Sequence, residues 1–126
     1  MRYVGKIDRE VYSCVARDIV TDEVIITDER VQHIIERRGK AFYDAYSPAF
    51  ADILADPDYI FGDSRPNTAL ACKTFSRDRT AVNLVVRFAV VSDGPQYKNS
   101  IITAIKENEK RFAQRIRNNV PLYKKE

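Results

Sequence analysis

At 126 residues, with 44% hydrophobic and 31% charged residues, the chain has the size and composition of one globular domain spanning residues 1–126. No apolar run approaches the roughly 20 residues that cross a bilayer, and the N-terminus lacks the basic-then-apolar order of a secretory signal, which argues against membrane contact and for a cytoplasmic location. The net charge of +3 is modest, but basic residues gather in the last quarter, as expected for a phosphate-binding surface or for a solvated helix and tail.

Histidine and cysteine, the usual zinc ligands, are scarce in the chain. The chain has one histidine and two widely separated cysteines, which argues against a zinc site and against a disulfide framework. Cys14 and Cys72 both lie among apolar residues, so we expect them to be small buried side chains.

The N-terminal quarter predicts short strands. Alternating side chains over residues 2–7 and the β-branched residues 24–26 are typical of strands. The segment 10–19 fits either a helix or a strand, and we favour a strand because hairpin neighbours are close in sequence.

Residues 28–39 predict a helix that displays the only histidine. Thr27 has the hydroxyl of an N-cap, acidic residues follow it, and Gly39 provides a stop. Because successive residues turn by about 100°, His33 lies nearly opposite the apolar stripe and beside Arg37, so we do not expect it in the core. The stripe consists of Val31, Ile34 and Ile35.

The rest of the chain predicts a second helix, a strand meander and a last helix. Ser47-Pro48 opens the second helix and Pro57 ends it. The further predicted elements are strands at 59–61, 69–75, 81–91 and 100–105, polar turns at 62–67 and 76–80, and a helix at 107–118. This order indicates the α+β class.

Arg87 is the first candidate for a functional cation. Alternation along the strand 81–91 places its apolar residues on one face and Asn83 and Arg87 on the other. A guanidinium in mid-strand needs an acidic partner, such as Asp52, Asp56 or Asp58, or an anionic ligand. Whether Lys73 emerges on the same side depends on the hairpin register.

Five segments, in this order, resemble the phage-associated nuclease domains of the barnase/EndoU/colicin/RelE-like superfamily. None is specific alone, but together they cover most of the chain from about Val24 onward. The segments are Ile26–Ile34, Ile53–Ile60, Arg65–Leu70, Lys98–Thr103 and Leu122–Glu126. The resemblance implies N-terminal helices packed on a mostly antiparallel sheet of four or five strands, with a C-terminal helix and the active site on the open sheet face.

The resemblance also implies metal-independent cleavage of RNA, without a cofactor, by attack of the ribose 2′-hydroxyl on the adjacent phosphodiester. That reaction needs a base, an acid and donors that hold the charge of the transition state. Histidine titrates near neutral pH, so His33 is assigned as acid or base. The charge-stabilising and hydrogen-bonding candidates are Arg37, Arg38, Lys73, Arg87, Ser100 and Thr103. Strand alternation places Ser100 and Thr103 on opposite faces unless a bulge intervenes, so we expect at most one of them in the site.

The implied partners are RNA, such as tRNA or another structured RNA, and an immunity or antitoxin protein. The residues expected to contact RNA are Arg65, Asn67, Thr68, Tyr97, Lys98, Tyr123 and Lys124. Asn67 and Thr68 fit turn chemistry equally well.

One departure from the family pattern leaves other readings open. Relatives tend to have Arg-His-Pro where this chain has Arg37-Arg38-Gly39, so a second imidazole is missing. The alternative is a catalytically silent RNA- or protein-binding module on the same fold. A third reading is a small-ligand or structural role unconnected with nucleic acid.

Overall fold

The computed structural model describes residues 1–76 and 78–126, so the predicted turn at 76–80 includes one residue, Arg77, outside the described part. The helices are α1 (Asp28–Arg38), α2 (Lys40–Tyr46), α3 (Phe50–Ala55) and α4 (Glu109–Asn118). The strands are β1 (Arg2–Lys6), β2 (Glu23–Ile26), β3 (Tyr59–Gly62), β4 (Thr68–Phe75), β5 (Thr80–Arg87), β6 (Asn99–Asn108) and β7 (Tyr123–Lys124). Short 3₁₀ helices occupy Val11–Cys14, Ser47–Ala49 and Val91–Asp93.

The described residues form one seven-stranded sheet in the order β1-β2-β6-β5-β4-β3-β7, so the expectation of four or five strands is wrong, although the α+β class holds. The additional strands lie at the edges. β2 joins β6 in parallel and β1 pairs with β2, while at the opposite edge β7 pairs with β3. Each added strand satisfies backbone groups that an exposed sheet edge would leave unpaired.

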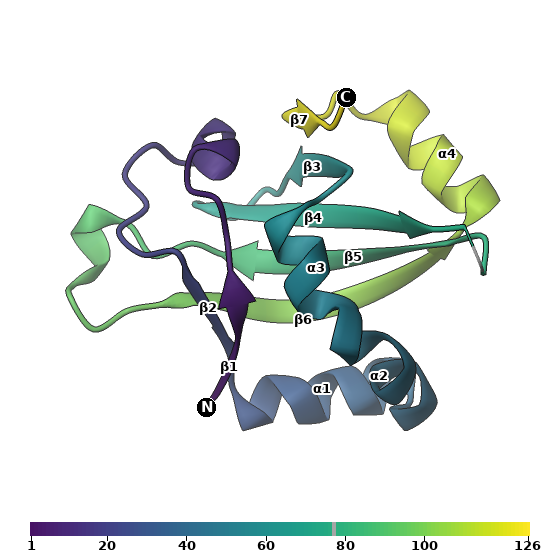
Figure 1. Ribbon diagram of the computed structural model, residues 1–126, viewed down its shortest axis with the longest axis horizontal. Coiled ribbons are helices and arrows are strands. Elements are labelled where there is room, and N and C mark those ends of the chain that lie inside the picture. The colour runs from purple at the N-terminus through teal and green to yellow at the C-terminus, as the bar shows by residue number, and fades with distance from the viewer. Residues whose placement is uncertain (77) are drawn as a thin grey trace.

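One face of the sheet, here called the inner face, packs on α1, α2 and α3. α3 crosses in front of the sheet in Figure 1. Ile34, Ile53 and Leu54 from these helices and Leu84 and Val86 from β5 are fully shielded in one cluster. The predicted alternation of β5 is thereby confirmed.

The opposite face, here called the outer face, is covered at one end by α4. Phe112 of α4 packs with Phe61, Leu70 and Val85. Beside this contact, the buried Glu107 at the end of β6 accepts hydrogen bonds from Arg115 Nε and Nη2 at 2.8 and 3.0 Å. This ion pair fixes the helix against the strand that precedes it.

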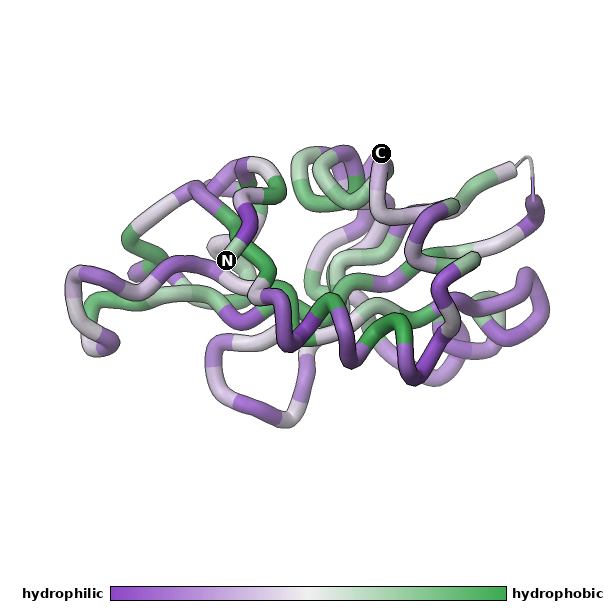
Figure 2. Tube along the Cα trace, turned by 90° about the horizontal axis from the view of Figure 1, so that it is seen from below, coloured by the Kyte–Doolittle hydropathy of each residue, from purple (hydrophilic) through white to green (hydrophobic). Residues whose placement is uncertain are grey.

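α1 lies along the edge of β6 that β2 leaves free. β2 pairs with β6 only at Asn99 and Ser100, and the chain then turns into α1. Farther along, Arg38 Nε donates to the Ala104 carbonyl at 3.2 Å. Figure 1 shows α1 beside this edge, and Figure 2, seen from below, shows hydrophobic and hydrophilic residues alternating along the helix in the foreground.

The predicted N-cap of α1 is confirmed, since the Thr27 hydroxyl accepts from the Arg30 amide at 3.2 Å.

Three other expectations need correction. The segment 10–19 is not a strand, because Tyr12 within a 3₁₀ helix inserts into the core and its hydroxyl donates to the Leu54 carbonyl. α2 was not predicted from the sequence. Cys72 is buried as expected, but Cys14 is exposed because it ends the same 3₁₀ helix on the solvent side.

The ion pair under α4 predicts an asymmetric response to two matched substitutions. Glu107→Gln leaves Arg115 without its carboxylate, and we expect a loss of about 2 kcal/mol in the free energy of unfolding. This loss is smaller than that for a fully buried pair, because the Arg115 side chain is partly exposed to water. Urea denaturation measures this loss. Glu109→Gln, which removes an exposed carboxylate 3.8 Å from Arg79, should change stability by less than about 0.5 kcal/mol. Equal losses for both variants would contradict the structural role of the pair.

Candidate active site on the outer sheet face

A bulge in β6 brings the two candidate hydroxyl residues onto one face. Ser100 pairs with Arg87 and Thr103 pairs with Val85, with a register shift between Val85 and Val86. Since Val85 and Arg87 are two residues apart on β5, Ser100 and Thr103 both lie on the outer face. The sequence predicted that Ser100 and Thr103 lie on opposite faces unless β6 contains a bulge. The bulge is present, so both hydroxyl residues share the face of Arg87.

The two hydroxyl groups are available to a ligand. Ser100 and Thr103 are half-buried, and their hydroxyls make no hydrogen bond to any residue that the structure describes. Their partners on β5 are two residues apart, so the side chains stand about 7 Å from each other along the sheet. The row formed by Arg87, Ser100 and Thr103 is here called the outer-face row.

Arg87 has an acidic partner, but none of the three that the sequence suggested. Its Nη1 and Nη2 donate to the two carboxylate oxygens of Asp93 at 2.9 and 2.8 Å, and Nη1 also donates to the Phe88 carbonyl. The hydrogen bonds from Arg87 lower the pKa of Asp93 to about 2, and they raise the pKa of Arg87. The Arg87 side chain nevertheless stays about one third exposed, with 36% accessible.

α1 presents His33 and Arg37 on one flank of the helix. His33 is half-buried and Arg37 is exposed, and neither forms an ion pair or side-chain hydrogen bond within the described residues. β2, whose Ile25 pairs with Ser100, leads into α1, and Arg38 at the end of α1 reaches the Ala104 carbonyl, so the helix runs along the bulged stretch of β6 with His33 in its middle. Arg38 is committed to the edge of β6 through its hydrogen bond to Ala104.

Lys73 does not join the outer-face row. It pairs with Val82, a buried inner-face residue, so the hairpin register places Lys73 and Arg87 on opposite faces. Its ammonium group donates to the carbonyl and carboxylate of Asp56 at 2.8 and 3.4 Å.

The residues around the turn after β3 have mainly structural contacts. Arg65 forms a fork with Asp63 at 2.9 and 3.1 Å. Asn67 adopts a φ of 53°, and its carbonyl accepts from the Phe88 amide. The buried Thr68 donates its hydroxyl to the Pro66 carbonyl at 2.9 Å. These contacts support the turn-chemistry interpretation of Asn67 and Thr68.

The other residues expected to contact RNA are divided between two ends of the sheet. Tyr97 is 58% exposed, in the loop that also carries Asp93, and Lys98 pairs with Glu23 at 2.5 Å. Tyr123 and Lys124 form β7 at the far edge, where Tyr123 packs on the core and Lys124 is exposed. Of these four residues, Tyr97 and Lys98 lie near the Arg87 end of the sheet, where Thr68 of β4 also pairs with Arg87.

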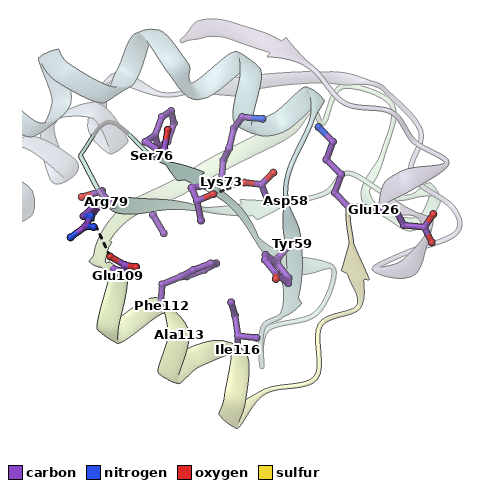
Figure 3. A pocket seen from close by; sticks show the side chains of 15 residues that line it. Asp58, Tyr59, Lys73, Ser76, Arg79, Glu109, Phe112, Ala113, Ile116 and Glu126 are labelled. Carbon is purple, nitrogen blue, oxygen red and sulfur yellow. Dashed lines mark hydrogen bonds and ion pairs between the residues drawn. The ribbon is translucent and has the colours of Figure 1, made fainter.

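A pocket of about 890 Å³ lies at the α4 end of the sheet. Phe112, Ile116 and Tyr59 line its floor, and Figure 3 shows the Phe112 and Tyr59 rings beside each other there. Lys73 lines this pocket, whereas no residue of the outer-face row does. The pocket is therefore a separate feature from the row.

Two ion pairs, Arg87–Asp93 and Glu107–Arg115, were not predicted from the sequence. Asp93 follows the mid-strand Arg87 by six residues, and an acid in an Asp-Gly-Pro segment so soon after it is a usable signal for a local ion pair. Glu107 and Arg115 are eight residues apart across a strand-to-helix junction, and nothing in their spacing indicates contact.

Two further kinds of feature are absent from residues 1–76 and 78–126. No three His, Cys, Asp or Glu side chains among them gather into a group that could hold a metal ion. None of the helices they form combines the length and the apolarity that crossing a bilayer requires.

The Arg87 fork predicts a strongly acidic carboxyl. A folded-state pKa of about 2 lies below the reference of about 3.9, so the stabilisation from Asp93 is complete above about pH 4 and is lost as the pH falls toward 2. NMR titration of the Asp93 carboxyl carbon should give this value, and Arg87→Gln should return the pKa toward the reference. A wild-type pKa near 4 would show that the fork does not persist in solution.

Comparison with known proteins yields one match. A search of curated proteins and a search of solved structures found none, but the family model described as phage-Barnase-EndoU-ColicinE5/D-RelE like nuclease2 matches residues 3–124. The match spans nearly the whole chain and confirms the resemblance seen in the sequence. The chain therefore belongs to the phage-Barnase-EndoU-ColicinE5/D-RelE like nuclease2 family.

Proposed function

We propose that this nuclease is an endoribonuclease that cuts RNA through its own 2′-hydroxyl, without a metal ion, at the outer-face row. The ribose 2′-oxygen attacks the adjacent phosphorus while a base accepts its proton. The bond from phosphorus to the 5′-oxygen breaks, and an acid protonates that oxygen. The products are a 2′,3′-cyclic phosphate and a free 5′-hydroxyl.

The observation that carries the proposal is the bulge in β6. It places the Ser100 and Thr103 hydroxyls on the same sheet face as the Arg87 side chain, which is about one third exposed. Charge develops on the phosphoryl oxygens in the transition state, and preorganised donors of this kind stabilise it. Arg87 supplies the positive charge, while Ser100 and Thr103 supply neutral hydrogen bonds.

His33 carries one of the two proton transfers, as general acid or base. Its imidazole has no partner within the described residues, so both ring nitrogens are open to a substrate. Arg37 lies one helical turn away on the same flank and contributes positive charge to an approaching RNA backbone. Arg38 acts on the helix position through Ala104.

A silent RNA-binding module on the same fold is the alternative, and the missing second histidine favours it. The two functions differ in one product. Only the nuclease generates 2′,3′-cyclic phosphate ends, whereas both bind RNA with an affinity that falls steeply as salt rises.

The primary test is cleavage of total tRNA and rRNA in EDTA, with mapping of the ends. His33→Ala and Arg87→Ala should each lower the rate by about 10²-fold or more, because each removes a proton-transfer group or a charge-stabilising donor. Gln32→Ala, on the exposed side of the same helix, is the control and should cleave at the wild-type rate. If His33→Ala cuts as fast as wild type, the acid or base is another residue. If wild type binds RNA in a salt-sensitive way but leaves it uncut, the silent module is the correct function.

The hydroxyl row gives a graded prediction. Ser100→Ala and Thr103→Val should each lower the cleavage rate by about 10-fold, less than loss of a charged donor. Lys73→Met should stay within about 3-fold of wild type, since Lys73 lies on the opposite face. A loss of 10²-fold in Lys73→Met would move the site toward the α4 pocket and contradict the outer-face assignment.

A further inference from the structure

Among the residues that the structure describes, Arg87 has two N–H groups that donate to no acceptor. A guanidinium has five N–H groups. Nη1 uses both of its own on Asp93 and on the Phe88 carbonyl, and Nη2 uses one on Asp93. The remaining two N–H groups, on Nε and Nη2, lie on one edge of the planar group and point the same way.

That edge has the geometry that binds phosphate. Two parallel N–H groups of a guanidinium match two oxygens of a phosphodiester in a bidentate fork. Ser100 stands directly opposite Arg87, and side chains in this relation have Cβ atoms about 5 Å apart. A phosphate bound by Arg87 is therefore one cross-strand pair away from Ser100.

Asp93 is itself held in place. Its Oδ2 accepts from the Val90 amide at 2.8 Å, and its own amide donates to the Val90 carbonyl at 2.9 Å. The side chain is largely buried, with 16% accessible. A carboxylate fixed on two sides restricts the guanidinium to one orientation.

We propose that Asp93 is the positioning residue of the site, which holds Arg87 by one edge so that the Nε–Nη2 edge receives an RNA phosphodiester. The inference rests on the proposed function. Two roles for this carboxylate differ in what they leave to the substrate: a positioning group leaves a guanidinium edge available to phosphate, whereas a competitor occupies the edge that phosphate uses. Here the bidentate contact consumes the Nη1–Nη2 edge and leaves the other edge free.

A double-mutant cycle in RNA cleavage tests the positioning role. Asp93→Asn should slow cleavage by about 10-fold, Arg87→Gln should slow it more, and the double variant should match Arg87→Gln within about 2-fold because Asp93 acts through Arg87. Asp44→Asn, which removes a carboxylate paired with Lys40, is the control and should leave the rate unchanged. Multiplicative losses would overturn the inference, and so would faster cleavage by Asp93→Asn, which would make the carboxylate a competitor of the substrate.

A second measurement does not depend on cleavage. The Arg87 Nε–Hε resonance should shift and saturate when inorganic phosphate is titrated into the wild-type protein, and Asp93→Asn should need at least about 10-fold more phosphate. Urea denaturation of the variant confirms that it remains folded. If RNA is uncut but this titration behaves as expected, the proposed function fails while the role of Asp93 stands. If the wild-type resonance ignores phosphate, or if Asp93→Asn responds equally, the role of Asp93 fails.

Discussion

The bulge in β6 is the constraint on which the candidate site depends. A regular strand would alternate Ser100 and Thr103 between the two faces, and only one hydroxyl could then accompany Arg87. The extra residue at the bulge turns the second hydroxyl to the outer face without breaking the pairing of β6 with β5. The cost is a local disruption of the hydrogen-bond ladder, and such irregularities persist where the surrounding structure fixes them. Here α1 lies along the bulged edge and Arg38 binds the Ala104 carbonyl just beyond it.

The two ends of the outer face serve different purposes. At one end α4 covers the sheet through Phe112 and the Glu107–Arg115 pair. Burial alone would raise the pKa of Glu107. The hydrogen bonds from Arg115 and Asn83 outweigh this effect and leave the pKa below its usual value. At the other end the Arg87 side chain stays about one third exposed, and Asp93 of the short 3₁₀ helix balances its charge. A rigid, closed end beside an open, charged end is a suitable arrangement for a surface that must hold a polyanion in one place.

Local patterns predicted most elements, and long-range pairing explains what they missed. Thr27, the apolar stripe of α1 and the alternation along β5 are visible in the sequence because each depends on neighbours within a few residues. The bulge is not visible, since Ile101 and Ile102 are both good strand residues in either register. β7 has two residues and exists only because β3 offers it a free edge.

The same limit applies to the site. Arg87 is a candidate because a guanidinium in mid-strand needs an acidic partner or an anionic ligand, and the structure confirms that it has an acidic partner. The partner is Asp93, which the chain brings back through a 3₁₀ helix rather than from α3 or its flanking turn. For Lys73 the sequence could not predict the face of the sheet, because that face depends on a hairpin register that no local pattern fixes.

Cleavage through the ribose 2′-hydroxyl is tested most directly by removing that hydroxyl from the RNA. An RNA oligonucleotide that the protein cuts at a mapped position would be prepared with one 2′-deoxynucleotide on the 5′ side of that bond, and its cleavage in EDTA compared with that of the all-ribose strand. Cutting at this bond should be abolished, while other bonds should still be cut and should end in 2′,3′-cyclic phosphates. Continued cleavage at the deoxy position would contradict this mechanism, because the reaction would then not use the ribose hydroxyl.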